Sequence, residues 1–320
     1  MNMQPTNLHT ILAPPTTKSA FTYKDVLATS ERVNWRVEDI IGEDKPLDFS
    51  RNFMPDTLAR TEVMMFLNRE EQMVANQIRG HNYLYMFGMV EEFILPFVLD
   101  HARSQLKDGD DYRVRALLQF ATEEAKHIHL FKTFRKAFTE GFGTPCDVIG
   151  PPAEIARAVL AHHPLAVALT ILHIEWMSQA HYVDSVKYDG TLDSQFKSLL
   201  KHHWMEEAQH AKLDSLMVDA LAESSTQEEI EIAISEYFEI IDMIDQGLRQ
   251  QAEFDADAFT AATGRSFHGD ERSLYVNTQH QAMRYTFIGS GMNHPQFMGS
   301  VKRISPNACG QVRSAAQVYS

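Results

Sequence analysis

The sequence contains only two cysteines, Cys146 and Cys309, in 320 residues. Two cysteines cannot form a disulfide framework or a thiolate metal site, so the sequence favours a reducing compartment, the cytoplasm. Basic residues are also scarce, because 29 lysines and arginines stand against 43 aspartates and glutamates, a formal net charge of −14. This charge argues against nucleic acid or an anionic membrane surface as the main partner.

Long apolar runs are missing as well. No segment approaches the roughly 20 apolar residues that span a bilayer, and the first 17 residues lack the basic segment and apolar run of a signal peptide. We therefore expect no membrane span. The sequence also has no GxGxxG pattern for a nucleotide or flavin, so a redox reaction here would need a separate electron donor or reductase.

Alternating strand patterns are nearly absent, whereas helical periodicity fills the chain from about residue 57. Segments rich in glycine, proline and aspartate divide this pattern. The predicted helices cover residues 58–79, 81–106, 111–140, 153–162, 165–187, 191–222 and 226–262. The predicted fold class is therefore all-α.

The distribution of proline and of apolar residues predicts three parts. Residues 1–55 carry several prolines and only short apolar runs, which is typical of an extended arm lying over a core. Residues 56–264 carry the helical pattern of a bundle. Residues 265–320 are expected to form a short helix and an irregular tail packed on that bundle.

One pentapeptide pattern occurs twice. EEAKH at 123–127 and EEAQH at 206–210 both contain Glu-x-x-His, as Glu124 with His127 and as Glu207 with His210. In ferritin-like four-helix bundles that bind two metal ions, two helices each give Glu-x-x-His and the other two each give one glutamate. A single Glu-x-x-His is more often a surface pair, but the repeat predicts a dinuclear site.

This architecture predicts one further glutamate on the helix before each motif. Before the second motif, Glu175 is the only acidic residue between Glu154 and Asp184, and it lies on a largely apolar face. Before the first motif, Glu91 and Glu92 are both available. Helical spacing places Glu91 opposite the polar face, so we choose Glu91 as the ligand and expect Glu92 beside the site.

A third histidine distinguishes the second motif. His203 lies four residues before Glu207, so both side chains share one face of a helix with His210. The matching position in the first motif is Phe120, so one metal ion gains an imidazole that the other lacks. Four carboxylates with two or three imidazoles suit iron or manganese better than zinc.

Two other glutamates are expected to orient the ligands. Glu123 and Glu206 immediately precede the ligand glutamates, and a metal-bound histidine usually donates its second N–H to a carboxylate. We expect them to accept these hydrogen bonds across the bundle. Tyr182 is a candidate neighbour of the metals, although an ordinary core tyrosine is the simpler interpretation.

The candidate residues resemble those of the ferritin-like non-haem di-iron proteins and, among these, the p-aminobenzoate N-oxygenase family. The resemblance covers roughly residues 60–300, including MNHPQF near the C-terminal end, and includes the additional histidine. It rests on Glu91, Glu124, His127, Glu175, His203, Glu207 and His210. Where the family commonly has arginine before the motif histidine, this chain has Lys126 and Gln209.

The resemblance implies a homodimeric helical bundle that uses two iron ions and O₂ to oxidise an amine to a hydroxylamine or nitro product. Two other functions fit the same ligands. One is a di-iron or manganese–iron oxidase or hydroxylase acting on an aliphatic or fatty substrate. The other is a ferroxidase without an organic substrate.

Overall fold

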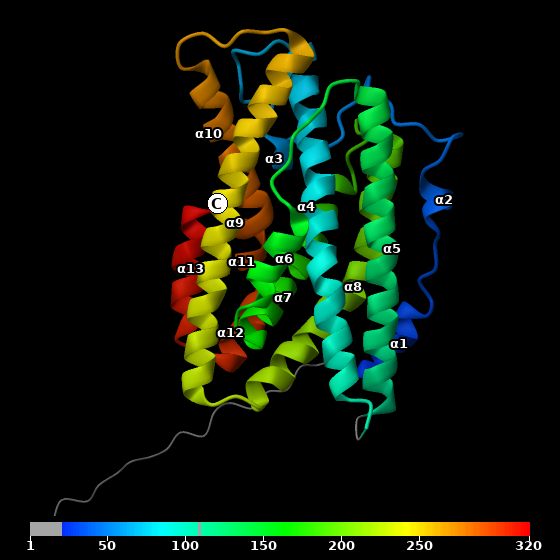
Figure 1. Ribbon diagram of the computed structural model, residues 1–320, viewed down its shortest axis with the longest axis vertical. Helices are drawn as coiled ribbons and strands as arrows, with labels where there is room; N and C mark the ends of the chain where they lie inside the picture. Colours follow the sequence, from blue (N-terminus) through cyan, green and yellow to red (C-terminus); the bar gives the residue numbers. More distant parts are fainter. Residues whose placement is uncertain (1–20, 108–109) are drawn as a thin grey trace, which may run out of the picture.

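The structure is a computed structural model, and it describes residues 21–107 and 110–320. Four helices form the central bundle (Figure 1). Helix α4 packs along α5, and α7 packs along α8. Their bounds are α4 (Arg69–Ser104), α5 (Asp111–Phe142), α7 (Pro164–Ala180) and α8 (Ser194–Glu223). The predicted all-α, ferritin-like fold is confirmed, and the described residues contain only isolated β-bridges.

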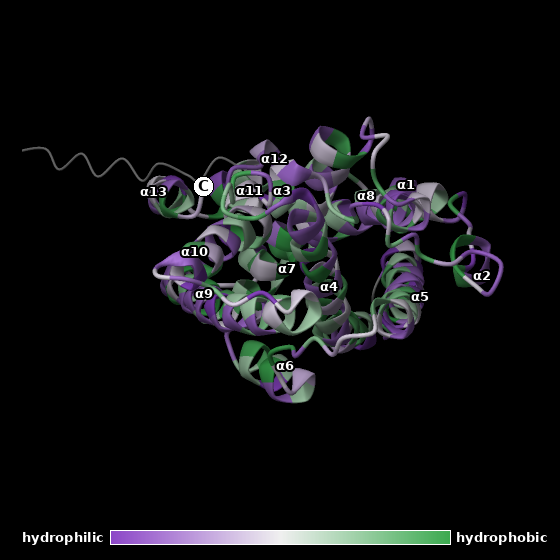
Figure 2. Cartoon of the chain, turned by 90° about the horizontal axis from the view of Figure 1, so that it is seen from above, coloured by the Kyte–Doolittle hydropathy of each residue, from purple (hydrophilic) through white to green (hydrophobic). Residues whose placement is uncertain are grey.

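Further helices surround this bundle. Helix α9 (Gln227–Thr263) lies against α4 and α7, and α10 (Glu271–Arg284) lies against α9. Seen from above, α4 and α7 lie centrally, α5 and α2 lie on one side, and α9, α10 and α13 lie on the other (Figure 2). The remaining elements are α1 (Tyr23–Ser30), α2 (Val37–Ile40), α3 (Asp56–Ala59), α6 (Pro152–Leu160), η1 (His181–Val186), η2 (Tyr285–Gly289), α11 (Ser290–Met292), α12 (Pro295–Ile304) and α13 (Ala308–Val318).

Side-chain caps set the ends of the long helices. Asn68 accepts hydrogen bonds from the backbone N–H groups of Glu70 and Glu71 at the start of α4, each 3.0 Å long. Asp193 caps α8 in the same way through the N–H of Phe196, at 2.6 Å. These caps satisfy donors that the first helical turn leaves unpaired.

The predicted helix break near residue 80 is wrong, because α4 continues through Gly80 and also through Pro96. A Cβ at Gly80 would lie 2.8 Å from Cβ of Phe53, so the glycine serves close packing and does not end the helix. The sequence pattern alone cannot distinguish these two uses of glycine.

The two ends of the chain are more helical than the sequence pattern indicates. Residues 23–30 and 37–40 of the predicted arm form α1 and α2, which lie against α5 and α8, while residues 1–20 lie outside the described residues. The tail after residue 265 is not irregular, because α10 to α13 occupy most of it. Among the described residues, no helix combines the length and apolarity that crossing a membrane requires.

Candidate metal centre

The four bundle helices bring all seven predicted ligands into the core. Each of these residues is at most 3% exposed. They are Glu91 on α4, Glu124 and His127 on α5, Glu175 on α7, and His203, Glu207 and His210 on α8. Six of the seven form two overlapping groups that could each hold a metal ion, and within each group the ligand atoms lie within 4.8 Å of one another.

The first group contains Glu91, His127, His203 and Glu207. His203 Nε2 lies 3.1 Å from Glu91 Oε1 and 2.9 Å from Glu207 Oε1. His127 Nδ1 lies 3.0 Å from Glu207 Oε1. Among the described residues, His127 Nδ1 nevertheless has no partner with hydrogen-bond geometry, so this nitrogen is available to a metal ion.

The second group contains Glu124, His127, Glu207 and His210. His210 Nδ1 lies 2.8 Å from Glu124 Oε1 and 3.2 Å from Glu207 Oε2. Because His127 and Glu207 belong to both groups, the two metal positions are adjacent. The predicted pairing of two Glu-x-x-His motifs in one site is therefore present in the structure.

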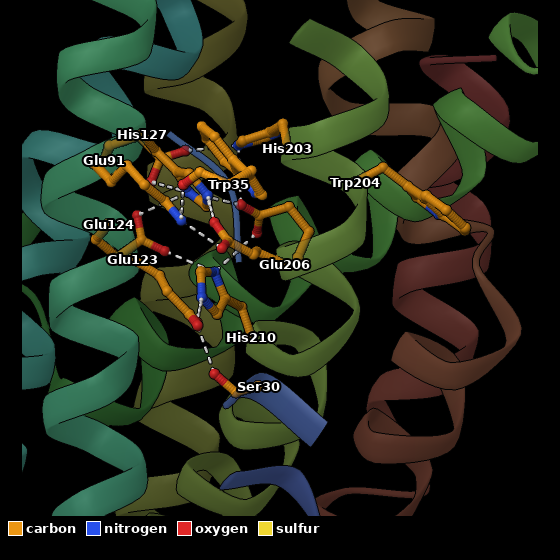
Figure 3. A network of polar contacts seen from close by, with 12 residues as sticks. Ser30, Trp35, Glu91, Glu123, Glu124, His127, His203, Trp204, Glu206 and His210 are labelled. Carbon is orange, nitrogen blue, oxygen red and sulfur yellow. Dashed lines mark hydrogen bonds and ion pairs between the residues drawn. The ribbon is translucent and has the colours of Figure 1, made fainter. Parts of the chain in front are cut away.

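Two outer carboxylates fix the orientation of the motif histidines (Figure 3). His127 Nε2 donates to Glu206 Oε2, and His210 Nε2 donates to Glu123 Oε2, each at 2.9 Å. Each bond crosses between α5 and α8. With a metal ion bound, it would place the proton on Nε2 and leave Nδ1 of the same ring to bind the ion.

The predicted arm supports both outer carboxylates. Ser30, at the end of α1, donates its hydroxyl to Glu123 Oε1 at 2.5 Å. Lys126 Nζ lies 2.5 Å from Glu206 Oε1 and 3.9 Å from the ring centroid of Trp35, between α1 and α2. Figure 3 shows Ser30 below Glu123 and Trp35 among the ligands. No short-range pattern in the sequence predicts these contacts of the arm.

The electrostatics of the cluster fit a pair of divalent cations. Although burial lowers it, the surrounding carboxylates, led by Glu207, raise the pKa of His127 to about 9. Burial, assisted by Glu207, holds the pKa of Glu175 well above its usual range. With all four ligand carboxylates ionised, the cluster would carry a formal charge of −4, which two divalent ions would balance. The donor set of carboxylates and imidazoles suits iron and manganese.

Glu175 approaches the cluster from α7 without belonging to either group of ligand atoms. Its Oε2 atom is buried and has no hydrogen-bond partner among the described residues. Its carboxyl instead interacts with that of Glu207. A carboxylate in this position can complete the coordination of an ion by a small side-chain rotation, so its role as a ligand stays a prediction.

Asp214 is a buried carboxylate that the sequence reasoning missed. It is fully buried on α8, one turn beyond His210, and neither carboxylate oxygen has a hydrogen-bond partner in the described part of the chain. Burial holds its pKa well above the usual range. The spacing of four from His210 and seven from Glu207 is the signal that could have revealed it.

Two residues expected beside the site lie elsewhere. Glu92 is ion-paired with Lys132 at 2.7 Å, on the partly exposed side of α4. Tyr182 stacks on Trp204 with ring centroids 4.6 Å apart, and Trp204 points away from the cluster in Figure 3. The periodicity correctly separated Glu91 from Glu92, but neither Glu92 nor Tyr182 contacts a ligand.

An apolar cavity of about 290 Å³ adjoins the cluster. Its walls come from α4, α6, α7, α9 and η2, together with the loop before α6. Two lining residues, Val90 and Ile174, immediately precede Glu91 and Glu175. A third, Phe87, meets the His203 ring edge-on with centroids 5.3 Å apart. One part of the cavity wall is therefore formed by residues that neighbour the ligands, although no ligand itself lines the cavity.

Two similar solved structures are variants of an R2-like ligand-binding oxidase. No protein-family model matches the chain, and no curated protein matches it. A variant of an R2-like ligand-binding oxidase with an anaerobically reconstituted Mn/Fe cofactor is 16% identical, with a TM-score of 0.49, and the match covers 89% of this chain and 94% of that one. Another variant, with an aerobically reconstituted Fe/Fe cofactor, is 15% identical, with a TM-score of 0.46, and the match covers 82% and 91% of the respective chains.

Proposed function

We propose that this protein is an oxygenase that uses two iron ions and O₂ to oxidise the nitrogen of a small amine to a hydroxylamine or nitro group. The observation that carries the proposal is the position of His203, between Glu91 and Glu207. At the matching position of the other motif, Phe120 stacks on His210 with ring centroids 4.1 Å apart. One metal position is thus richer in nitrogen ligands than the other.

Three kinds of side chain would have different roles in the proposed reaction: the metal ligands, the carboxylates that orient the histidines, and Phe87. The two ions, as an Fe/Fe or a Mn/Fe pair, would supply the electrons that reduce O₂. The ligand carboxylates would hold the cations, while Glu123 and Glu206 accept hydrogen bonds from Nε2 of His210 and His127 and so orient these rings toward the ions. Phe87, next to His203, separates the cluster from the apolar cavity and limits the access of water.

The partners follow from the same reasoning. A small organic substrate would enter the cavity beside Phe87. A separate reductase or small electron donor would return the metals to the reduced state, because the sequence carries no GxGxxG pattern for a flavin or nucleotide. We also propose a homodimer in the cytoplasm, which light scattering on the purified protein and cell fractionation would test.

The test begins with anaerobic loading of the metal-free protein with Fe(II). We expect two ions per chain, and after addition of O₂ and an arylamine, mass spectrometry should find the hydroxylamine or nitro product. In His203→Ala we expect two ions with one bound more weakly and at least a tenfold loss of N-oxygenation, while Glu140→Gln, at an exposed position on α5, should match the wild type. Failure to bind two ions, or full activity of His203→Ala, would contradict the proposal.

A second function is favoured by the apolar lining of the cavity. Four methionines and three phenylalanines line it, which also suits an oxidase or hydroxylase acting on an aliphatic substrate. Mass spectrometry distinguishes the two, because such an enzyme would add oxygen to carbon or remove hydrogen from it. A ferroxidase would consume O₂ with further Fe(II) and would need no organic substrate.

A further inference from the structure

The cavity beside Phe87 has a closed inner end and an open mouth. Its inner end is lined by Phe87, whose ring meets that of His203, and by Val90 and Ile174, the residues that precede Glu91 and Glu175. Its outer end is lined by Gln246 and Gln250, which are exposed on α9. A molecule that enters between α6 and α9 would therefore reach the cluster with its leading end.

No lining residue of this cavity is ionisable. Its polar side chains are Thr170, Gln246 and Gln250, and the Thr170 hydroxyl already donates to the carbonyl of Ala166 at 3.0 Å. The buried guanidinium of Arg79 contacts the ring of Phe287, 5.3 Å from its centroid, but does not line the cavity. A carboxylate or ammonium group inside would thus lose its hydration without gaining an ionic partner.

This cost selects the charge state of the ligand. Moving an unpaired charge from water into such surroundings costs several kcal/mol, so a neutral molecule is strongly favoured. An alkylamine is an ammonium ion at pH 7, whereas an arylamine is neutral because its lone pair is delocalised into the ring. The four methionines, Met86, Met89, Met177 and Met243, also offer sulfur contacts to an aromatic ring.

We propose that this cavity binds a neutral arylamine that carries neither a carboxylate nor an ammonium group. The ring lies among the methionines, the amino group points to Phe87, and any neutral polar substituent lies near Gln246 and Gln250. This inference rests on the proposed function for the direction of the amino group. The selection by charge rests on the lining alone, and p-aminobenzoate itself would be a poor ligand.

The test measures binding to the full-length, metal-free protein by isothermal titration calorimetry, so that turnover is not needed. The probes are three matched compounds: ethyl 4-aminobenzoate, which is neutral, 4-aminobenzoate, which is an anion, and 4-ethylbenzylamine, which is a cation. We expect the neutral ester to bind at least tenfold more tightly than either ion. Equal or tighter binding of an ion would overturn the proposal, and tighter binding of the anion would point to Arg79.

Two variants locate the binding. Met243 is half-buried in the cavity wall, so Met243→Trp should fill the space and weaken binding of the ester at least tenfold. Met298→Trp is the matched control, because Met298 is half-buried on α12 and does not line the cavity. If Met243→Trp fails to fold, as judged by circular dichroism, Gln250→Arg at the exposed mouth replaces it and should strengthen binding of 4-aminobenzoate. Unchanged affinity in the folded cavity variant would contradict the assignment.

Failure of this inference is distinguishable from failure of the proposed function. If the protein binds the ester but not two Fe(II) ions, the inference about the cavity holds and the proposed oxygenase function is contradicted. If the protein binds two Fe(II) ions but prefers a charged probe, the metal centre is supported and the inference that the cavity selects neutral ligands is contradicted.

Discussion

Trp35 stacks on the metal-site residue His127, with ring centroids 6.0 Å apart and ring planes 8° from parallel. Trp35 is 7% exposed, and its neighbours Asn34 and Arg36 are exposed. The indole therefore lies just beneath the surface and covers one face of the imidazole ring. Lys126 lies over the same indole, so one residue of the arm links the surface, a ligand and the lysine that pairs with Glu206.

This contact makes Trp35 a reporter of metal binding. We expect Mn(II) to quench its fluorescence, because the paramagnetic ion would bind to the imidazole on which the indole stacks. Trp35→Phe should remove most of the quenching, whereas Trp204→Phe should preserve it, because Trp204 stacks on Tyr182 instead. A fluorescence titration measures both. Equal loss of quenching in the two variants would show that the signal does not come from the stacked pair.

Glu206 should control metal affinity without binding the metal. In Glu206→Gln the side chain has lost its charge, and His127 is less firmly held with its proton on Nε2. We expect a 10- to 100-fold weaker metal affinity, measured by competition with a chelator. Glu140→Gln is the control on the exposed face of α5. An unchanged affinity in Glu206→Gln would mean that packing alone orients His127.

Removal of the metals should destabilise the protein. Ions that bind only the folded protein stabilise it, so without cations the buried carboxylates and histidines of the cluster lose this contribution. Saturating metal at about 1,000 times its dissociation constant should stabilise the fold by about 4 kcal/mol for each bound ion, measured as a higher Tm in calorimetry. Glu175→Gln replaces a candidate ligand carboxylate with a neutral amide that binds cations less well, so at the same metal concentration we expect a smaller difference between its metal-loaded and metal-free forms. A Tm that does not change when a chelator removes the metal ions would argue against a buried metal pair.

The ligands could be predicted from the sequence because they depend on helical spacing. Glu-x-x-His fixes two side chains on one face, and the bundle requires a glutamate on each preceding helix, so Glu91 and Glu175 could be placed. Asp214 has the same helical spacing, but the ligand pattern of the four-helix bundle contains no carboxylate at this position, so Asp214 was not predicted. A search of each ligand face for further carboxylates would have found it.

The supporting contacts could not be predicted in this way. Ser30 and Glu123 are 93 residues apart, and Trp35 reaches His127 from a loop with no regular pattern. Such contacts depend on how α1 packs across α5 and α8, which is a tertiary property. The cavity could not be predicted from the sequence either, because its methionines and phenylalanines have the same spacing as ordinary core residues.

Acid should destabilise the fold through buried neutral histidines, of which His81 is the simplest case. Burial, assisted by Arg135, lowers the pKa of His81 to about 4, against 6.5 for the unfolded chain. Between these values the unfolded state binds more protons, so stability falls as the pH falls from 6.5 to 4. Each such proton changes the free energy of unfolding by about 1.4 kcal/mol per pH unit.

The variant His81→Leu isolates this contribution. We expect its urea unfolding free energy to fall less steeply between pH 6.5 and 4 than that of the wild type, by up to one proton. His129→Leu on α5 is the control, since His129 is exposed. Parallel pH profiles of wild type and His81→Leu would show that His81 titrates normally in the folded state.

Gly80 and Gly310 should respond in opposite ways to substitution by alanine. A Cβ at Gly80 would lie 2.8 Å from the Phe53 side chain and 3.3 Å from that of Phe196, so the tightly packed core must shift. Overpacking of this kind costs about 1–3 kcal/mol, which exceeds the gain of about 1 kcal/mol from higher helix propensity. Gly310 lies in α13 with no atom within 4 Å of an added Cβ, so only the gain in propensity applies. Urea denaturation should therefore show Gly80→Ala to be less stable than the wild type and Gly310→Ala to be slightly more stable. If Gly80→Ala were also more stable, the glycine would be a dispensable interruption of α4 and not the residue that lets Phe53 approach it.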